Sequence, residues 1–268
     1  MYKHAHIDRI NKRTMSTAAE YYTAHNGLTA CEHAALQLVQ DAANKPILDI
    51  GVGAGRTTAA LIELSSDYIG IDYVEEMVGQ CKGQYPHLDF ECADARDLSR
   101  FSDGQFYLIV FSMNGLSMVD HAGRMAILHE VYRLLQPDGV FLFSSYNKAN
   151  RRHLKNFHFP EFHFTFHPLK LVKRKLRFIY STLLRAWNRY RHRKHEVHTD
   201  EYSMVNDVCH DYSTMLYYTS RSNQIDQLRE AGFSGDITTI DLEGTQIDGE
   251  TGHDSIFYVV RKQKTENR

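Results

Sequence analysis

Pro46-Ile-Leu-Asp-Ile-Gly-Val-Gly-Ala-Gly-Arg56 is the stretch that decides the fold. Its first five residues form a short apolar run of the kind found in a strand buried on both faces. Gly51, Gly53 and Gly55 follow at once, and a helical pattern begins at Arg56. Glycines let the backbone fold tightly beneath a ligand, and the first turn of a helix offers free N–H groups. The stretch therefore predicts a strand, a ligand-binding turn and a helix.

The same alternation of apolar runs and helical patterns continues along the chain. Further strand candidates occupy residues 68–71, 88–92, 106–111 and 140–146, with helical patterns at 56–64, 74–82 and 122–135. Strands that alternate with helices predict a mainly parallel sheet with right-handed crossovers. After a helix at 222–231 come two more strand candidates, 236–242 and 255–261, whose glycine-rich connection would let them pair antiparallel.

The composition excludes several classes of protein. Of the 268 residues, 43% are hydrophobic and 24% charged, as in ordinary globular domains, and no apolar run is long enough to span a membrane. The first residues lack the apolar core of a secretory signal. The four cysteines have no CxxC spacing, which is typical of free thiols in a reducing compartment. We therefore expect a cytoplasmic protein.

The position of Asp72 narrows the class of ligand. Asp72 ends the second strand candidate, 21 residues after Gly51, where an acid can accept hydrogen bonds from ribose hydroxyls. Its alternative role is that of a helix cap. The nicotinamide fingerprint GxGxxG would place its third glycine at position 56, where this chain has Arg56. A dehydrogenase is therefore the weaker interpretation.

Four short motifs lie in order along the chain: Leu48–Gly55, Gly70–Tyr73, Cys92–Ala95 and Leu134–Gly139. Together they resemble the motifs of the class I S-adenosylmethionine-dependent methyltransferases, although Asp138 stands where the LLxPGG turn of that family has a glycine. The resemblance is strong over residues 45–147 and looser over 224–262. It implies an α/β, Rossmann-like fold with a seven-stranded, mainly parallel sheet whose last strand is antiparallel. It also implies S-adenosylmethionine as the cofactor.

The resemblance assigns roles at the cofactor site. Asp72 would hold the ribose, Tyr73 would flank the adenine, and Asp94 would lie near the adenine amino group. The tract after the fourth strand would line the methionine end of the cofactor. The full expected set is Asp49, Gly51, Gly53, Gly55, Arg56, Asp72, Tyr73, Met77, Asp94, Ala95, Ser112, Asn114 and Tyr22.

Asp94 could instead be an acid of the loop that does not touch the cofactor, and three further residues keep an alternative role. Asp49 could steady the glycine turn without touching the ligand. Arg56 could reach the cofactor carboxylate or face solvent. Tyr22 could cover the cofactor or pack against the core.

The segments outside the motifs are expected to form the substrate side. We expect residues 1–44 to be a helical lid, residues 45–147 and 221–268 the cofactor-binding core, and residues 148–220 a basic helical insertion that caps the substrate. Methyl transfer from a sulfonium depends mainly on in-line alignment, so no motif identifies a base. His210 is the candidate base, and a structural or surface histidine is the alternative. The expected substrate contacts are Asn114, Tyr146, Asn147, Tyr212, Tyr217 and Tyr218.

The insertion is strongly basic. Residues 151–198 hold thirteen Lys and Arg against two acids, and seven of the sixteen histidines. Apolar residues from Leu169 to Tyr190 recur at three- and four-residue steps, which predicts a long amphipathic helix. This helix could be a lid, an RNA-binding surface, or an attachment to an anionic membrane or an acidic partner. No metal is expected, because no carboxylate or thiol completes an obvious ligand set with His163, His167, His192, His195 and His198.

These observations predict a methyltransferase that acts on a small molecule or metabolite, mainly by aligning it with the cofactor. An RNA-modifying methyltransferase that uses the basic insertion is the alternative. A non-catalytic cofactor-binding scaffold is a third possibility. The sequence does not determine the oligomeric state.

Overall fold

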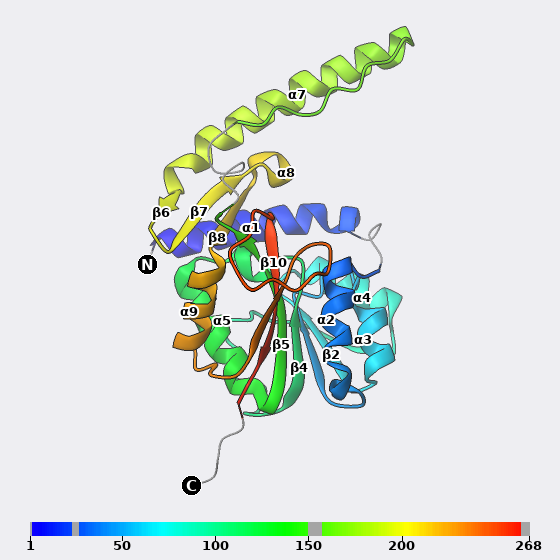
Figure 1. The fold of residues 1–268 in the computed structure, drawn as a ribbon. Coiled ribbons are helices and arrows are strands. Elements are labelled where there is room, and N and C mark those ends of the chain that lie inside the picture. Colours follow the sequence, from blue (N-terminus) through cyan, green and yellow to red (C-terminus); the bar gives the residue numbers. More distant parts are fainter. Residues whose placement is uncertain (1, 23–26, 150–156, 264–268) are drawn as a thin grey trace.

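The computed structural model describes residues 2–22, 27–149 and 157–263, with the backbone alone for residues 2–5 and 20. A central sheet is flanked by helices, helix α1 crosses one end of it, and a long helix extends away from the rest (Figure 1). Arg151, Arg152 and Lys155 of the basic insertion lie outside the described residues.

Seven of the strands form the core of the sheet. Their bounds are β1 (Ile47–Ile50), β2 (Tyr68–Asp72), β3 (Asp89–Cys92), β4 (Phe106–Phe111), β5 (Leu135–Asn147), β9 (Ile237–Ile240) and β10 (Ser255–Arg261). They pair in the order β3-β2-β1-β4-β5-β10-β9, and β10 runs antiparallel to both of its neighbours. This order confirms the expected seven-stranded, mainly parallel sheet with an antiparallel last strand.

Helices cover both faces of this sheet. Successive residues of a strand point to opposite faces. Thus Ile109 packs with α5 (His121–Leu134) and α9 (Arg221–Glu230), and Val110 packs on the other face with α2 (Ala30–Gln37), α3 (Thr58–Leu64) and α4 (Glu75–Gln84). Burial on both faces explains why β4 is apolar throughout. Single 3₁₀ turns occupy Gln40–Ala42, Gly115–Met118 and Arg193–His195.

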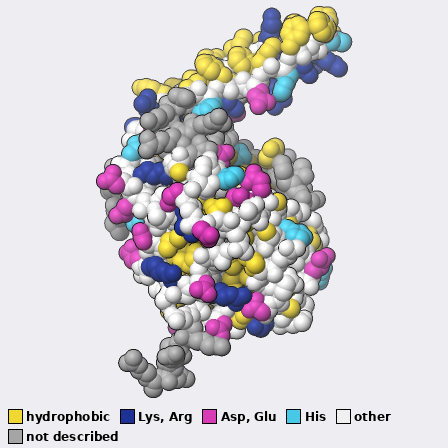
Figure 2. Space-filling model, viewed as in Figure 1, with side chains coloured by type: hydrophobic (Ala, Val, Ile, Leu, Met, Phe, Trp, Pro, Cys, Tyr) yellow, Lys and Arg dark blue, Asp and Glu magenta, His cyan; other side chains and the backbone are white. Residues whose placement is uncertain are grey.

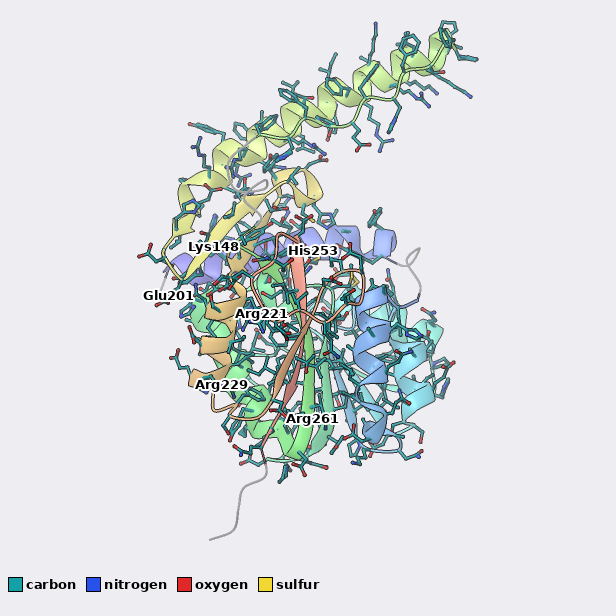
Figure 3. The ribbon with its side chains drawn as sticks, viewed as in Figure 1. Lys148, Glu201, Arg221, Arg229, His253 and Arg261 are labelled. Carbon is teal, nitrogen blue, oxygen red and sulfur yellow. The ribbon has the colours of Figure 1, made fainter. Side chains whose placement is uncertain are left out.

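Three further strands extend the sheet where the sequence predicts only a helical insertion: β6 (Val197–His198), β7 (Tyr202–Asp207) and β8 (Thr214–Thr219). Strand β5 continues past its partner β4, and β8 pairs in parallel with this free end through Tyr146 and Asn147. Strands β7 and β6 follow antiparallel. The Lys148 side chain lies beside this extension and donates to the carbonyl oxygen of Asp200 at 3.0 Å (Figure 3). The unpaired backbone of β5 thus finds its partners in β8.

Helix α1 (Tyr2–Tyr22) is anchored between the sheet core and this extension (Figure 1). The fully buried amide of Asn11 donates to the carbonyl oxygens of Met118 and Met215, at 2.6 and 2.8 Å, and accepts from the Met215 N–H. Helix α7 (Pro168–His192) confirms the predicted long helix, and α8 (Cys209–Tyr212) is a short turn at its base. Within the described residues, no helix combines the length and the apolar character needed to cross a bilayer.

Candidate cofactor and substrate site

The glycine turn joins the carboxyl end of β1 to α3. Gly51 and Gly53 have φ values of +64° and +57°, which favour glycine. A Cβ added to Gly51 would lie 2.6 Å from the Phe111 ring. The turn therefore needs glycine here for its backbone conformation and for its close approach to β4.

Asp72 links this turn to the end of β2. One of its carboxylate oxygens accepts the Gly53 N–H at 2.9 Å, and the other accepts the Val74 N–H at 2.9 Å. Asp72 is 6% exposed, and burial raises the pKa of its carboxyl group. A carboxylate offers about four acceptor positions. Asp72 therefore ties the glycine turn to the residue that precedes α4, and it still has acceptor positions for a pair of ligand hydroxyls.

A cavity of about 360 Å³ opens over the turn and Asp72. The carboxyl ends of the parallel strands form its floor, and α1, α8 and β8 form its far wall. Twelve of the expected site residues line it: Gly51, Gly53, Arg56, Asp72, Tyr73, Met77, Asp94, Ala95, Ser112, Asn114, Tyr22 and Tyr146. The fold thus brings together side chains that lie between positions 22 and 146 of the sequence.

Arg56 is held by a residue that sequence reasoning missed. Its guanidinium pairs with the buried carboxylate of Glu32, at 2.7 Å for one hydrogen bond, and donates to the Ser112 hydroxyl at 3.1 Å. Burial alone would raise the pKa of Glu32, but the hydrogen bonds and charge of Arg56 lower it overall. Glu32 is also the N3 residue of a capping box with Thr29 at the start of α2. Arg56 therefore does not face solvent, and α2 holds its orientation.

Asp94 is tied to the N-terminal helix through Arg96. Arg96 donates to Asp94 and, at 2.6 Å, to the Asp8 carboxylate on α1. Burial would raise the pKa of Asp94, but these hydrogen bonds from Arg96 lower it overall. Asp8 and Arg96 both line the cavity. The Asp8–Arg96–Asp94 chain thus holds α1 over the part of the cavity next to β3.

Tyr22 of α1 and His210 of α8 meet at the wall of the cavity. The Tyr22 hydroxyl lies 2.9 Å from Nε2 of His210, and Tyr22 lines the cavity while His210 stands behind it. Burial lowers the pKa of His210 and raises the pKa of Tyr22 to about 12. At neutral pH the pair is therefore a phenol next to a neutral imidazole. Tyr22 also packs with Met77, so it covers the cavity and contacts the core.

The segment that carries His210 has an uncommon backbone conformation. His210, Asp211 and Tyr212 have φ values of 50°, 55° and 61°, in the left-handed region. Contacts hold them there, because the Asp211 carboxylate accepts from Arg185 on α7 at 2.6 Å. Asn206 also donates to the Tyr212 carbonyl at 2.8 Å. Strained residues of this kind gather at functional sites.

Comparisons with known proteins agree with this geometry. The sequence profile of a family described as "Methyltransferase domain" matches residues 47–139. The demethylmenaquinone methyltransferase of Beutenbergia cavernae is 32% identical over 101 residues, which cover 38% of this chain and 40% of that protein. The ubiquinone biosynthesis O-methyltransferase of Coxiella burnetii is 26% identical over 147 residues, covering 53% of this chain and 61% of that protein. The chain thus spans less than two thirds of the length of these relatives.

Solved structures share the fold. The 1,6-didemethyltoxoflavin-N1-methyltransferase of Burkholderia thailandensis, solved with S-adenosylhomocysteine, has a TM-score of 0.53 at 15% identity, covering 88% of this chain and 79% of that one. An S-adenosylmethionine-dependent methyltransferase of Clostridium acetobutylicum has a TM-score of 0.57 at 12% identity, covering 87% and 91%. Residues 47–139 of this chain thus match a methyltransferase domain, and the fold around them is the one that these S-adenosylmethionine-dependent methyltransferases share.

The cavity of this methyltransferase domain fits the cofactor of the family. Asp72 can accept from the two ribose hydroxyls, and the Tyr73 ring lies beside it. Two buried polar atoms in the cavity wall, the Tyr73 hydroxyl and Oδ1 of Asn114, have no hydrogen-bond partner within the described residues. Such atoms are costly unless a ligand or water pairs with them. The wall therefore has polar groups available for a ligand.

Besides His210, six expected site residues lie outside the wall of the cavity. Asp49 is buried beneath the turn, where its carboxylate accepts from Thr57 and Tyr68, at 2.8 and 3.0 Å. This position matches the alternative role of Asp49, in which it steadies the glycine turn without touching the ligand. Gly55 packs against Tyr85 and Cys81 on the helical side. The other four were expected to contact substrate: Asn147, Tyr212, Tyr217 and Tyr218.

The four other residues that were expected to contact substrate are buried. Tyr217 bonds His121 and Gln227, and Tyr218 donates to Asp207 at 2.7 Å. Asn147 donates to the Thr251 carbonyl oxygen, and Tyr212 stacks on Phe157. The structure places all four outside the cavity wall: Asn147 ends β5, Tyr212 lies on α8, and Tyr217 and Tyr218 lie in the packed faces of β8. Thr214 and Leu216 of the same strand line the cavity instead, together with Cys209.

Asp138 shows why the family has a glycine at this turn. Its φ is +60°, in the region that glycine adopts most easily. The turn lies inside the long strand β5, between the part that begins beside Phe106 and the part that continues to Asn147. Asp is one of the residues that best tolerate this conformation, so the departure from the motif preserves the turn.

A cluster of possible metal ligands is found outside the insertion and includes none of its histidines. Ligand atoms of Asp241, Glu243 and His253 lie within 4.8 Å of one another, in the connection between β9 and β10 (Figure 3 labels His253). His253 and Glu243 are partly or fully exposed. Exposed carboxylates near a histidine also occur without a metal, so the cluster alone does not indicate a site.

Proposed function

We propose that this protein transfers a methyl group from S-adenosylmethionine to a small molecule bound in the cavity beneath α1. One observation carries the proposal. A single cavity joins the glycine turn and Asp72 to a second region walled by Tyr22, Tyr146 and Leu216. The first region suits a nucleoside, and the second suits a small acceptor, because ligand cavities combine apolar walls with a few polar groups.

The cofactor would supply a methyl group on a sulfonium, which needs little activation. The residues of this chain would then bind and align the reactants. Asp72 would accept from the ribose, and the unpartnered Oδ1 of Asn114 in the cavity wall would help to position the acceptor molecule. Helix α1 would keep water out through the Asp8–Arg96 contact and the Asn11 anchor.

The Tyr22–His210 pair would handle the proton when the acceptor atom carries one. The acceptor's proton would pass to the Tyr22 oxygen as the Tyr22 proton passes to Nε2 of His210. The imidazole can take it because burial keeps this ring neutral at neutral pH. The acceptor then bears the methyl group, and His210 returns its proton to solvent after release of the product.

The enclosed cavity favours a small acceptor over RNA. Its walls come from α1, β8 and the ends of the core strands, so a polymer would have to displace α1 to reach the cofactor. The names of the relatives agree with this choice, since the B. cavernae protein is named a demethylmenaquinone methyltransferase and the C. burnetii protein a ubiquinone biosynthesis O-methyltransferase. The B. thailandensis structure holds 1,6-didemethyltoxoflavin, a small molecule.

A label-transfer experiment tests the proposal. The full chain is incubated with methyl-labelled S-adenosylmethionine and a cell extract separated into RNA, protein, lipid and small-molecule fractions. We expect label in a low-molecular-weight product, lost with Asp72→Ala and kept with Glu63→Gln, an exposed acid on α3. Label in RNA would overturn the choice of acceptor. Binding of S-adenosylhomocysteine without any transfer would favour a scaffold.

A further inference from the structure

Helix α7 forms an arm that projects from the methyltransferase domain (Figure 1). It has 25 residues, and at 1.5 Å per residue it is about 37 Å long. It contacts α8, the 3₁₀ turn, Glu196 and β7 at its base, and the preceding segment 157–167 along its length. Most of the length of the arm is therefore not needed to attach it to the domain.

The apolar side of this arm faces solvent. At about 100° per residue, the large apolar side chains fall within roughly a third of the helix circumference. Each of them is at least half exposed: Leu169 71%, Val172 55%, Leu176 62%, Ile179 54%, Tyr180 68%, Leu183 66%, Trp187 58% and Tyr190 79%. Figure 2 shows these hydrophobic side chains as a continuous band along the arm. We call them the apolar stripe.

The polar side of the arm makes the contacts with the rest of the protein. Arg174 donates to the carbonyl oxygens of His163 and Phe164, at 2.9 and 3.0 Å. Arg185 and Asn188 donate to the side chain and the backbone of Asp211, at 2.6 and 2.9 Å. A lid packed on the core would present its apolar side inward. This helix does the opposite, so the lid interpretation of the apolar stripe is wrong.

The segment before the arm adds aromatic side chains to the exposed surface. Phe159, Phe162, Phe164 and Phe166 are 65%, 41%, 62% and 94% exposed. Monomeric proteins rarely leave so many neighbouring large apolar side chains in water. These aromatics lie along the polar side of the arm, where Phe162 packs on Phe178, so the apolar stripe by itself marks a surface that is covered by something else.

The charges next to the stripe indicate what covers it. Helix α7 contains eight Lys and Arg and no acidic residue. Lys173 and Arg191 fall along one edge of the stripe and Lys175 along the other, at about 100° per residue, and all three are exposed. A helix with an apolar stripe flanked by cations on both edges matches the interface of an anionic lipid bilayer.

We propose that the arm docks this protein on an anionic membrane surface, with the apolar stripe in the headgroup region and the flanking cations on lipid phosphates. A second copy of the arm fits less well, because two stripes packed together would bring cationic edges against cationic edges. RNA fits less well, because phosphate contacts would leave the apolar stripe in water. The proposal does not depend on methyl transfer, so the two can fail separately.

The chain's single tryptophan, Trp187, lies in the stripe and reports on docking without a label. The full chain is mixed with vesicles of phosphatidylglycerol and phosphatidylcholine, or of phosphatidylcholine alone. We expect a blue shift of the emission and co-sedimentation with the anionic vesicles, both weakened by salt. An unshifted emission and a protein that stays in the supernatant would overturn the proposal.

Two pairs of variants separate the apolar and electrostatic parts. Leu176→Ser with Leu183→Ser should weaken vesicle binding by at least about tenfold. Its control is Leu38→Ser with Leu242→Ser, which alters exposed leucines outside the arm and should leave binding unchanged. Lys173→Gln with Lys175→Gln, one cation from each edge of the stripe, should weaken binding to anionic vesicles by roughly tenfold. Its control is Lys82→Gln with Arg13→Gln, at exposed positions off the arm.

Three results would count against a membrane. Full binding by the Leu176→Ser/Leu183→Ser variant would mean that the stripe is not the contact. A concentration-dependent dimer in the absence of lipid, lost in that variant, would assign the stripe to a second copy. Binding of RNA that displaces the protein from vesicles and survives the leucine changes would assign the cations to nucleic acid.

Discussion

Removal of the Asp72 carboxylate should show whether this group binds the ligand or only accepts backbone N–H groups of the turn. Asp72 holds two backbone N–H groups at 2.9 Å, and its remaining acceptor positions face the cavity. A hydrogen bond to a charged acceptor contributes about 1.5–3 kcal/mol. The loss of two ribose contacts should therefore cost at least about 3 kcal/mol, which is a roughly 150-fold rise in the Kd for S-adenosylhomocysteine.

The assay is titration calorimetry with S-adenosylhomocysteine on the wild type, Asp72→Ala, Asp72→Asn and Glu63→Gln. Glu63 is an exposed acid on α3, so Glu63→Gln controls for the loss of a negative charge. We expect a large loss of affinity for the alanine variant, a smaller loss for the asparagine variant and none for the control. Because burial raises the pKa of Asp72, affinity should also fall as the pH is lowered and the carboxylate takes up a proton.

The unliganded variants separate binding from folding. Asp72→Ala also leaves the Gly53 and Val74 N–H groups without their acceptor, so its melting temperature should fall. A variant that melts lower but binds S-adenosylhomocysteine within about threefold of the wild type would refute the reasoning. Asp72 would then serve the turn alone.

Three further predictions concern residues around the site. Asp49→Asn should flatten the dependence of stability on pH. Burial raises the pKa of Asp49 to about 7, so between about pH 4 and pH 7 the folded state holds a proton that the unfolded chain has released, and the stability of the wild type falls as the pH rises through this range. Equal effects of the variant on the denaturant midpoints at pH 5 and pH 8 would contradict this. Tyr22→Phe should lower kcat by about 10- to 100-fold and flatten the acid limb of the pH–rate profile that His210 produces; an unchanged profile would remove the pair from the mechanism. Asp138→Val should destabilise the fold by about 1–2 kcal/mol, whereas Asp138→Gly should be neutral or stabilising, because only the β-branched residue resists a φ of +60°; thermal melts of both variants decide it.

The core of the fold could be predicted from the sequence because its signals are local. The apolar run before Gly51, the glycine turn and the helix after it lie within about twenty residues, and each indicates its own structure. Strand β4 is apolar throughout because both of its faces are covered. The residues of the cofactor side, such as Asp72 and Tyr73, follow directly from the ends of such strands.

The substrate side required the tertiary structure. Strand β8 exists because β5 extends beyond β4 and leaves backbone groups to be paired, which no pattern within residues 214–219 reveals. Its pairing then decides that Leu216 faces the cavity and Tyr217 does not. Likewise, Asp8 meets Arg96, and Tyr22 meets His210, only because α1 lies across the sheet.

The arm shows the same division most clearly. The three- and four-residue spacing from Leu169 to Tyr190 determined that these side chains share one face of a long helix. It could not determine whether that face meets the protein or the solvent, since periodicity is a property of the helix alone. The tertiary structure decided this, because Arg174, Arg185 and Asn188 bond to the rest of the chain and turn the apolar stripe outward.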